Sequence, residues 1–496
     1  MKRSLSLRSK VTDVTLSRTN QSGVPRLQTA RSTLASAEPG FTARHGMSAR
    51  ASNVELALQA RPGTLLWRLS LPNVLSNLLI TLVTIADAWF VGRLGGAALA
   101  SLALVFPFQS LMQMFGNGAV GGGIASAISR SLGAGDAPRA SVLAWHALLI
   151  AGTLSLVFML VFVLFARPIF MLMGATGPSL DGAVTYAAIA FGASTASWLF
   201  FSMFAICRGC ADMRTPARVL LVSTVAQAIL SGCLTLGIAG TSFDGIGVLG
   251  PAVAIVLCQG LAGLALLLHA RGGHLPIRIA PHRFDWSAIR AIMRVGGLGM
   301  INSLTIVMSI VVVTGLIGQF GDQALGGYGL GSRLELMLVP IAFGIGGALT
   351  TAVGINIGAG QHPRARHLAR FGSLVALAII APIGIVLAIW PQLWLGAFTQ
   401  DPSVSEYGAS YLRIVGPLFG VFVAGQVLYF ASQGTGFMRI PVAIGVLRFL
   451  IVTSLGSLSL AAGFGLTGIF TAVSLGMLTI GVGMWASTCG PAWRKP

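Results

Sequence analysis

The chain alternates long apolar segments with short polar connectors. Apolar stretches of about 20 residues or more recur, each long enough to cross a hydrocarbon layer of ~30 Å as a helix. We predict twelve of them: 65–91, 97–128, 142–166, 184–207, 216–239, 247–269, 288–317, 324–356, 368–395, 407–432, 441–462 and 467–488. The pattern therefore predicts an all-α membrane protein with twelve transmembrane helices.

Arginine is distributed unevenly between the connectors. If the N-terminus lies inside, the inner connectors hold most of the arginines, including the four of residues 271–290. The outer connectors hold Arg93 and Arg167 but are otherwise mainly acidic. This asymmetry follows the positive-inside rule. It predicts a multi-pass protein of the cell inner (plasma) membrane with both termini in the cytoplasm.

The two halves of the chain repeat one another. The segment Leu132-Gly-Ala-Gly-Asp-Ala-Pro-Arg-Ala140 returns as Ile357-Gly-Ala-Gly-Gln-His-Pro-Arg-Ala365, at an offset of 225 residues. Six spans in each half give both halves the same orientation, so they are parallel repeats related by an axis along the membrane normal. Two facing six-helix bundles would enclose a central cavity suited to alternating access, and a duplicated scaffold without transport is the alternative.

This repeat predicts the domain organisation. We expect a leader, an N-terminal lobe, a cytoplasmic linker, a C-terminal lobe and a cytoplasmic tail, covering residues 1–61, 62–270, 271–290, 291–490 and 491–496 in that order.

Composition excludes several classes of protein. The chain is 55% hydrophobic and only 9% charged, whereas soluble domains carry about 25% charged residues. This composition excludes a soluble protein.

The net charge of +19 does not indicate a nucleic-acid-binding protein. The leader contributes +7 of it, from 10 Lys/Arg against 3 acidic residues. The remaining charge forms no basic-aromatic patch, so we expect no nucleic-acid partner. Cys207-Arg-Gly-Cys210 has the CxxC spacing, but no second pair or His completes a metal site, so we also expect no cofactor.

Residues 1–61 have the composition of a disordered, basic cytoplasmic leader. Their richness in Arg and Ser also resembles a transit peptide. A third interpretation is that translation begins at Met47, so that residues 1–46 do not belong to the native protein.

Only two of the 13 acidic residues fall well inside predicted spans: Asp87 in the first and Glu335 in the eighth. A charged carboxylate at the bilayer centre costs about 2.5–3.5 kcal/mol on insertion scales, so such residues usually face a cavity and act in function. Asp87 could exchange a proton between the two sides or bind Na⁺ together with neighbouring oxygens. Its counterpart in the repeat is Val313, which assigns cation coupling to the N-terminal lobe.

Asp87 belongs to a polar stripe. Asn73, Ser76 and Thr84 lie within about 60° of it at helical spacing, and Asn77 lies at the edge of the stripe. We predict that these residues line the cavity. The alternative is that they form hydrogen bonds between helices.

Three further groups of polar residues are candidates. Glu335 is either a second cation-attracting acid or part of a buried ion pair that fixes its helix. Arg333 is expected to face another span or the cavity. Gln426 and Gln433 are the polar groups of the tenth span and candidates for cavity lining.

Several motifs together resemble the multidrug and toxin extrusion (MATE) family, over residues 65–490. In the first half they are Leu71-Pro72, Asp87-Ala-Trp-Phe-Val-Gly-Arg-Leu-Gly95, Ser131-Leu-Gly-Ala-Gly-Asp136 and Arg208-Gly-x-x-Asp-Met-Arg-Thr-Pro216. In the second half, Tyr328-Gly-Leu-Gly-Ser-Arg-Leu-Glu335 and Gly358-Ala-Gly360 resemble its bacterial DinF-like branch.

The resemblance implies a twelve-helix antiporter that expels organic cations or other amphipathic compounds in exchange for H⁺ or Na⁺. It also implies that Asp87 is the coupling acid of the N-terminal lobe. Span 7 lacks the acid found in other branches, which favours the DinF-like branch. Span 5 lacks the Asn and Asp that the family often has, which favours H⁺ over a complete Na⁺ site.

We therefore expect a non-enzymatic efflux transporter, acting as a monomer in the bilayer on small amphipathic or cationic substrates. The alternative within transport is a lipid-linked oligosaccharide flippase, which would need a basic cavity, for which Arg333 and Arg413 are candidates. A membrane enzyme would need a metal or nucleophile cluster, and the sequence contains no motif for one. A receptor or scaffold would not need a buried acid.

Overall fold

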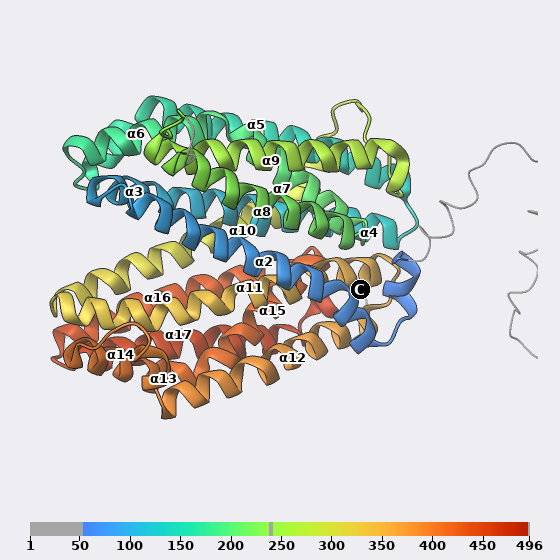
Figure 1. The fold of residues 1–496 in the computed structure, drawn as a ribbon. Coiled ribbons are helices and arrows are strands. Elements are labelled where there is room, and N and C mark those ends of the chain that lie inside the picture. Colours follow the sequence, from blue (N-terminus) through green and yellow to red (C-terminus); the bar gives the residue numbers. More distant parts are fainter. Residues whose placement is uncertain (1–52, 238–241, 495–496) are drawn as a thin grey trace, which may run out of the picture. The chain divides into compact units, whose positions relative to one another are not determined.

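The computed structural model describes residues 53–237 and 242–494, and throughout this part of the chain the regular secondary structure is helical (Figure 1). The side chains of Ser76 and Leu336 are not part of that description. Among the described residues, eleven helical segments are long and apolar enough to cross a membrane, and a bent pair of helices makes a twelfth. The prediction of a twelve-helix membrane protein is confirmed.

The helices of the first half are α2 (Pro62–Gly92), α3 (Gly96–Gln113), the π-helix η1 (Met114–Val120), α4 (Gly121–Gly133), α5 (Ala137–Leu172), α6 (Gly177–Gly192), α7 (Ser194–Gly209), α8 (Arg214–Leu236), η2 (Gly247–Leu249), α9 (Gly250–His269) and η3 (Ala270–His274). Those of the second half are α10 (Trp286–Gly318), α11 (Asp322–Gly358), α12 (His362–Ile389), α13 (Gln392–Leu395), α14 (Pro402–Val415), η4 (Gly416–Leu418), α15 (Phe419–Thr435), α16 (Arg439–Ala461), α17 (Gly465–Ser487) and η5 (Pro491–Trp493).

Side-chain caps and prolines set several helix ends. Asp136 and Asp401 each accept a hydrogen bond from a backbone N–H in the first turn of the helix that follows them. The predicted ninth span runs too far, to residue 395, whereas α12 ends at Ile389. Pro391 has no N–H to continue the helix, and a separate short helix, α13, follows it.

The fourth span is bent rather than straight. Helices α6 and α7 meet at an angle of 47° around Ala193, without a proline at the break. The sequence there is Gly192-Ala-Ser194, and pairs of Gly and Ser are a recognised cause of sharp kinks.

The helices form two six-span bundles with separate apolar cores. We call α2–α9 the N-terminal bundle and α10–α17 the C-terminal bundle. The first turns of α2, including Leu65 and Leu69, belong to the core of the C-terminal bundle. The linker residue Ile277 and the start of α10, including Ile292, belong to the core of the N-terminal bundle. The first helix of each repeat therefore crosses from one bundle to the other.

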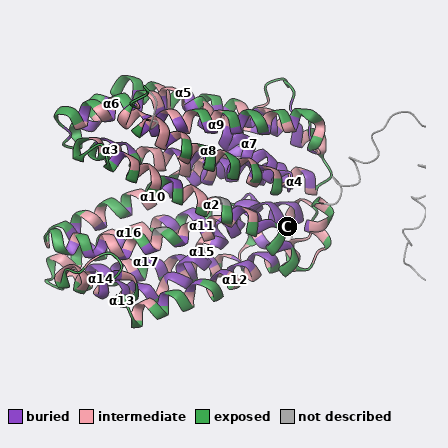
Figure 2. Ribbon diagram, in the orientation of Figure 1, coloured by how far each residue is buried: buried purple, intermediate pink, exposed green. Residues whose placement is uncertain are grey.

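The most buried helices occupy equivalent places in the two repeats. Figure 2 shows buried residues concentrated along α4 and α7 in one bundle and α11 and α15 in the other. These helices belong to spans 2, 4, 8 and 10, which are paired by the repeat. The centre of each bundle is thus built from the same two repeat elements.

Both ends of the described chain pack at one end of the helices, around α11 and α12 (Figure 1). We call this the proximal end and the opposite end, which carries Gly95 and Gly321, the distal end. The Asn356 amide donates to the carbonyl of Ala57 at 3.0 Å, and Arg370 donates to the Thr488 hydroxyl at 2.9 Å. Residues 53–59 form a helix, so the prediction of disorder is wrong for this stretch. Residues 1–52 and 495–496 of the predicted leader and tail lie outside the described residues.

At the proximal half, reciprocal hydrogen bonds join the two bundles. The hydroxyl of Thr351 on α11 donates to the carbonyl of Arg208 on α7 at 3.0 Å. The hydroxyl of Ser126 on α4 donates to the carbonyl of Gln433 on α15. The 225-residue offset relates Ser126 to Thr351 and Arg208 to Gln433, so one contact is the two-fold counterpart of the other.

Two glycines of the repeated motif make a second reciprocal contact. A Cβ atom on Gly133 would lie 2.1 Å from the carbonyl oxygen of Ile355, and one on Gly358 would lie 2.1 Å from that of Arg130. The same offset relates the two contacts. The repeated Gly-Ala-Gly therefore lets α4 and α11 approach closely. We call the residues of these reciprocal contacts the proximal seal: Ser126, Arg130, Gly133, Arg208, Thr351, Ile355, Gly358 and Gln433.

Candidate functional site

A cavity of about 900 Å³ lies between the bundles in their distal half. Most of its wall comes from α2, α3, α8 and α9 of the N-terminal bundle. The C-terminal bundle contributes Arg333 and Met337 of α11, Trp394 of α13 and the nearby Phe398. The cavity thus touches both halves of the repeat, while the proximal seal holds the bundles together on its other side.

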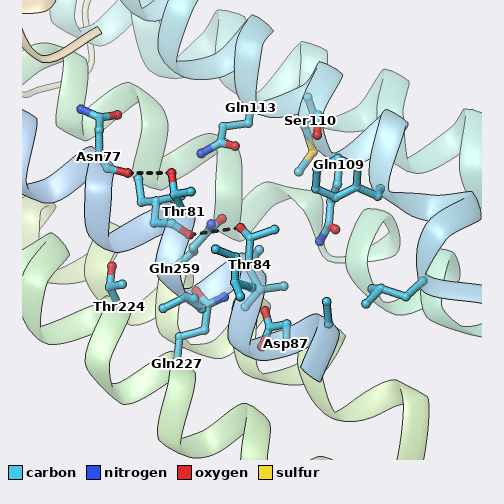
Figure 3. Close-up of a pocket in the computed structure, with 18 of the residues that line it drawn as sticks. Asn77, Thr81, Thr84, Asp87, Gln109, Ser110, Gln113, Thr224, Gln227 and Gln259 are labelled. Carbon is cyan, nitrogen blue, oxygen red and sulfur yellow. Dashed lines mark hydrogen bonds between the residues drawn. The ribbon is translucent and has the colours of Figure 1, made fainter. Parts of the chain in front are cut away.

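Asp87 lies on the cavity wall, on the distal half of α2, and is half-buried. The hydroxyl of Ser231 on α8 donates a hydrogen bond of 2.5 Å to its Oδ1 atom. Gln227, one turn earlier on α8, is within hydrogen-bonding reach of the same carboxylate. Figure 3 shows Asp87 and Thr84 on α2 with Gln227 close by. Both neighbours stabilise an ionised carboxylate that still faces the cavity.

Carboxamides and aromatic rings make up much of the remaining wall. Gln109 and Gln113 of α3 and Gln259 of α9 line the cavity (Figure 3), and Gln109 donates to the Tyr186 hydroxyl at 3.4 Å. The Oε1 atom of Gln259 is buried without a hydrogen-bond partner in the described part of the chain. The aromatic lining residues are Phe106, Phe200, Phe201, Phe204 and Phe398 together with Tyr186 and Trp394. Such a wall suits ligands with an aromatic body and a few polar groups.

The polar stripe of α2 divides between two environments. Asn77 and Thr84 line the cavity with Asp87. Asn73 is buried outside it, and its amide donates to the carbonyl of Gly344 on α11 at 3.0 Å. Asn73 therefore joins α2 to the C-terminal bundle, because the proximal half of α2 packs on α11. The structure does not describe the side chain of Ser76, the remaining residue of the stripe.

The other predicted site residues have separate locations. Arg333 is exposed and lines the cavity, whereas Arg413 and Gln426 are not among the lining residues. Gln433 is buried in the proximal seal, where its amide donates to the carbonyl of Gly118 at 3.0 Å.

Glu335 points into the C-terminal bundle rather than contributing to the cavity lining. Its Oε2 atom accepts a hydrogen bond from the Tyr411 hydroxyl at 3.0 Å, and Arg448 is close enough to interact with it electrostatically. The ring of Tyr328 packs edge-on against Tyr411 with a centroid distance of 5.5 Å. This arrangement favours the structural alternative for Glu335, a buried charge cluster that holds α11 in its bundle.

Sequence reasoning missed the partners of Asp87 on the fifth span. Thr224, Gln227 and Ser231 all contact the cavity or the carboxylate. Their spacing of three and four residues is the same helical spacing that identified the stripe on α2. The expectation for this span concerned only Asn and Asp and therefore did not include these three residues.

The C-terminal bundle has no counterpart of this site. Val313 and Gly456 occupy the positions that the repeat pairs with Asp87 and Ser231, and Val313 is buried in the apolar core. The chemistry of the two halves is therefore unequal although their helices correspond.

These features define a class: polytopic membrane proteins with an internal repeat and a polar cavity between the two repeat bundles. A family model described as MatE matches residues 72–231 and residues 299–458, once in each half. The chain belongs to the MATE family.

Curated relatives share about a quarter of their residues with this chain. It is 27% identical over 388 residues to an FAD transporter of Shewanella oneidensis, covering 77% of this chain and 84% of the relative. It is 26% identical over 384 residues to the probable multidrug resistance protein NorM of Thermotoga maritima, covering 76% and 81%. The probable multidrug resistance protein YoeA of Bacillus subtilis is 25% identical over 405 residues, covering 80% and 87%.

Solved structures have the same fold. A MATE protein in complex with MaD3S superposes with a TM-score of 0.82, and an outward-facing multidrug resistance MATE transporter with a TM-score of 0.81. Each is 20% identical, and each match covers 90% of this chain and 99% of the other. The likeness confirms the predicted pair of six-helix bundles.

Proposed function

We propose that this protein is a secondary active efflux antiporter, which exports organic cations or other amphipathic compounds in exchange for H⁺ or Na⁺. The observation that carries the proposal is the Asp87 carboxylate on the wall of a cavity between two repeat bundles. Membership of the MATE family and the multidrug resistance names of two relatives support export of small molecules.

In this proposal, the positive-inside distribution of arginine places the proximal end and both termini in the cytoplasm. The arrangement of the bundles is then the outward-open state, in which the cavity faces the outside. Opening the proximal seal while closing the distal half would expose the same cavity to the cytoplasm. Parallel repeats allow this exchange as a rocking of one bundle against the other.

Asp87 couples the two movements in the following way. The ionised carboxylate, stabilised by Ser231 and Gln227, attracts a cationic substrate from the cytoplasmic side. In the outward-open state a proton neutralises the carboxylate and displaces the substrate. For Na⁺ coupling, the oxygens of Asp87, Ser231 and Gln227 would provide the ligands.

Purified protein in liposomes tests the proposal, with a pH gradient or a Na⁺ gradient imposed one at a time. We expect wild type to drive efflux of a fluorescent cation with one of the gradients, and Asp87→Asn to abolish it. Asp322→Asn is the matched control, because it makes the same change at an exposed acid outside the cavity lining. Equal transport by wild type and Asp87→Asn would contradict the coupling role.

A second candidate is export of anionic amphipathic compounds, which include lipid-linked oligosaccharides and FAD. It is favoured by Arg333, which lines the cavity, and by the FAD transporter among the relatives. If anions are the substrates, Arg333→Gln should reduce transport of FAD or of an anionic dye, whereas Arg413→Gln, away from the cavity, should not. Unchanged anion transport and retained cation transport in Arg333→Gln would favour the cation exporter.

A further inference from the structure

The guanidinium of Arg208 is buried next to the cavity, and no acidic residue in the described part of the chain forms an ion pair with it. Arg208 is only 5% exposed. Its Nη2 atom donates to the carbonyl of Asn117 at 3.2 Å, and its guanidinium lies 5.3 Å from the ring centre of Phe204. Its Nε atom has no hydrogen-bond partner, and no carboxylate forms an ion pair with it among the described residues. An arginine keeps its charge in proteins, so this is a buried and unpaired positive charge.

This charge lies between the cavity and the proximal end. Asn117 and Phe204, which contact the guanidinium, are part of the cavity lining. The carbonyl of Arg208 accepts the Thr351 hydrogen bond of the proximal seal. A Cβ atom on Gly347 of α11 would lie 2.9 Å from the Nη1 atom, so the guanidinium also packs against the opposite bundle.

The repeat shows that packing at this place does not need a charge. Gln433 occupies the position related to Arg208 by the 225-residue offset. Its amide donates to the carbonyl of Gly118, the neighbour of Asn117 in the π-helix η1, and its Oε1 atom faces Gly122, the counterpart of Gly347. A neutral glutamine therefore packs against the corresponding glycine of the opposite bundle.

A buried charge without a counter-ion is unfavourable, and ionisable residues buried at membrane depth usually have a function. The cavity beside it contains Asp87, whose carboxylate attracts H⁺ and other cations into the cavity. A fixed positive charge in a medium of low dielectric constant repels cations that approach within a few ångströms. Membrane channels exclude protons and cations by placing an arginine in this way.

We propose that Arg208 is an electrostatic barrier that prevents H⁺ and Na⁺ from leaking through the closed proximal seal while the cavity is open at the distal end. The proposal rests on the alternating-access part of the proposed function, but not on the identity of the substrate or the coupling ion.

The test measures passive ion leak in liposomes that contain the purified protein and no substrate. Leak of H⁺ and Na⁺ is compared with leak of nitrate for wild type, Arg208→Gln and Arg208→Lys. We expect Arg208→Gln to increase cation leak about tenfold or more with little change in nitrate leak. Arg208→Lys keeps the charge and should remain as tight as wild type.

Gln433→Leu is the matched control, because it removes a cross-bundle hydrogen bond at the position that the repeat pairs with Arg208, without changing the charge. Equal increases in cation and nitrate leak, or a leak in Gln433→Leu equal to that in Arg208→Gln, would overturn the proposal in favour of loosened packing. Wild-type cation leak in Arg208→Gln would also overturn it. Elution as a single folded species and retained binding of the fluorescent cation used in the transport assay establish that each variant is intact. A separate Asp87→Asn assay reports failure of the proposed coupling independently.

Discussion

At the scale of single residues, the neighbouring helix decides what a polar side chain on α2 does. Asn73 and Asp87 lie on the same stripe, but Asn73 meets a backbone carbonyl of α11, whereas Asp87 meets Ser231 and the cavity. The sequence identifies both as unusual, since polar groups in a membrane helix need partners. Which partner each one finds depends on where α2 crosses between the bundles.

Ser231 is the residue whose removal tests this local chemistry most directly. A hydrogen bond to a charged group contributes about 1.5–3 kcal/mol, so Ser231→Ala should slow gradient-driven transport by about tenfold or more. Initial rates of efflux in liposomes provide the measurement. Ser110→Ala also removes a hydroxyl from the cavity wall, but not one that contacts Asp87. It should leave the rate within about twofold of wild type, since substitutions away from such contacts usually have small effects. Equal rates for the two variants would show that the contact with Asp87 is unimportant.

At the scale of elements, the linker before α10 is fixed to the N-terminal bundle. Asp285 caps α10 and accepts a hydrogen bond from the Arg139 guanidinium of α5. Its backbone N–H donates to Nε2 of the buried His146 at 2.8 Å, and the backbone N–H of Arg278 donates to the Ser141 hydroxyl. The linker and the start of α10 should therefore move with the N-terminal bundle.

The Arg139–Asp285 pair has a defined pH dependence. Hydrogen bonds hold the pKa of Asp285 well below its usual range. The bond from Arg139 has the largest effect, and those from Ser287 contribute less. A carboxyl with a lowered pKa stabilises the folded state above its unfolded pKa of ~3.9 and loses this effect only below it.

Asp285→Asn should therefore increase hydrogen exchange of residues 275–285, by the same factor at pH 6 and at pH 8. Mass spectrometry of the purified protein measures this exchange. Asp181→Asn, which breaks the exposed pair with Arg167, is the control and should leave the linker unchanged. A difference between wild type and Asp285→Asn that disappears at pH 6 would contradict the assignment.

At the scale of the whole molecule, the internal repeat builds the contact that closes the proximal end. The glycine contacts of α4 and α11 and the hydroxyl contacts of Ser126 and Thr351 are related by one two-fold operation. The Gly-Ala-Gly motif, which the sequence shows only as a repeat, thus forms an interface in which each copy packs against the opposite half. Each half contributes one glycine and one backbone carbonyl to these contacts. Equivalent substitutions in the two halves should therefore have equal effects.

Gly133→Ala and Gly358→Ala should each favour separation of the bundles at the proximal end, because the new Cβ atom would lie 2.1 Å from a backbone oxygen. Spin labels on exposed cysteines introduced at Ala134 and Ala359, after removal of the five native cysteines, report the distance across the seal. We expect both variants to shift the distance distribution to longer values by a similar amount.

Gly329→Ala is the matched control on α11, where nothing lies within 4 Å of the added atom, and it should leave the distribution unchanged. A shift in only one of the two seal variants would show that the contacts are not equivalent in strength.

Sequence patterns determined the spans, the repeat and the candidate acid. Apolar runs of membrane length, the 225-residue offset and an acid inside a span are local properties, and the cost of exposing polar groups to lipid makes them reliable. Asn77 and Thr84, which the same reasoning placed beside Asp87, line the cavity with it. Arg333, expected to face either another span or the cavity, also lines the cavity. Sequence reasoning did not locate the break at Ala193 or the π-helix that presents the carbonyls of Asn117 and Gly118.

Tertiary structure alone decided which polar residues share a site. A polar stripe shows which face of its helix needs a partner, but not which residue that partner is. The contact of Asp87 with Ser231 and that of Glu335 with Tyr411 depend on how helices distant in sequence pack together. The proximal seal is the clearest case, because its residues are hundreds of positions apart and meet only when the two repeats face each other. A single sequence records that the halves are alike, whereas the structure shows where they touch and that Arg208, at this contact, forms no ion pair with any described residue.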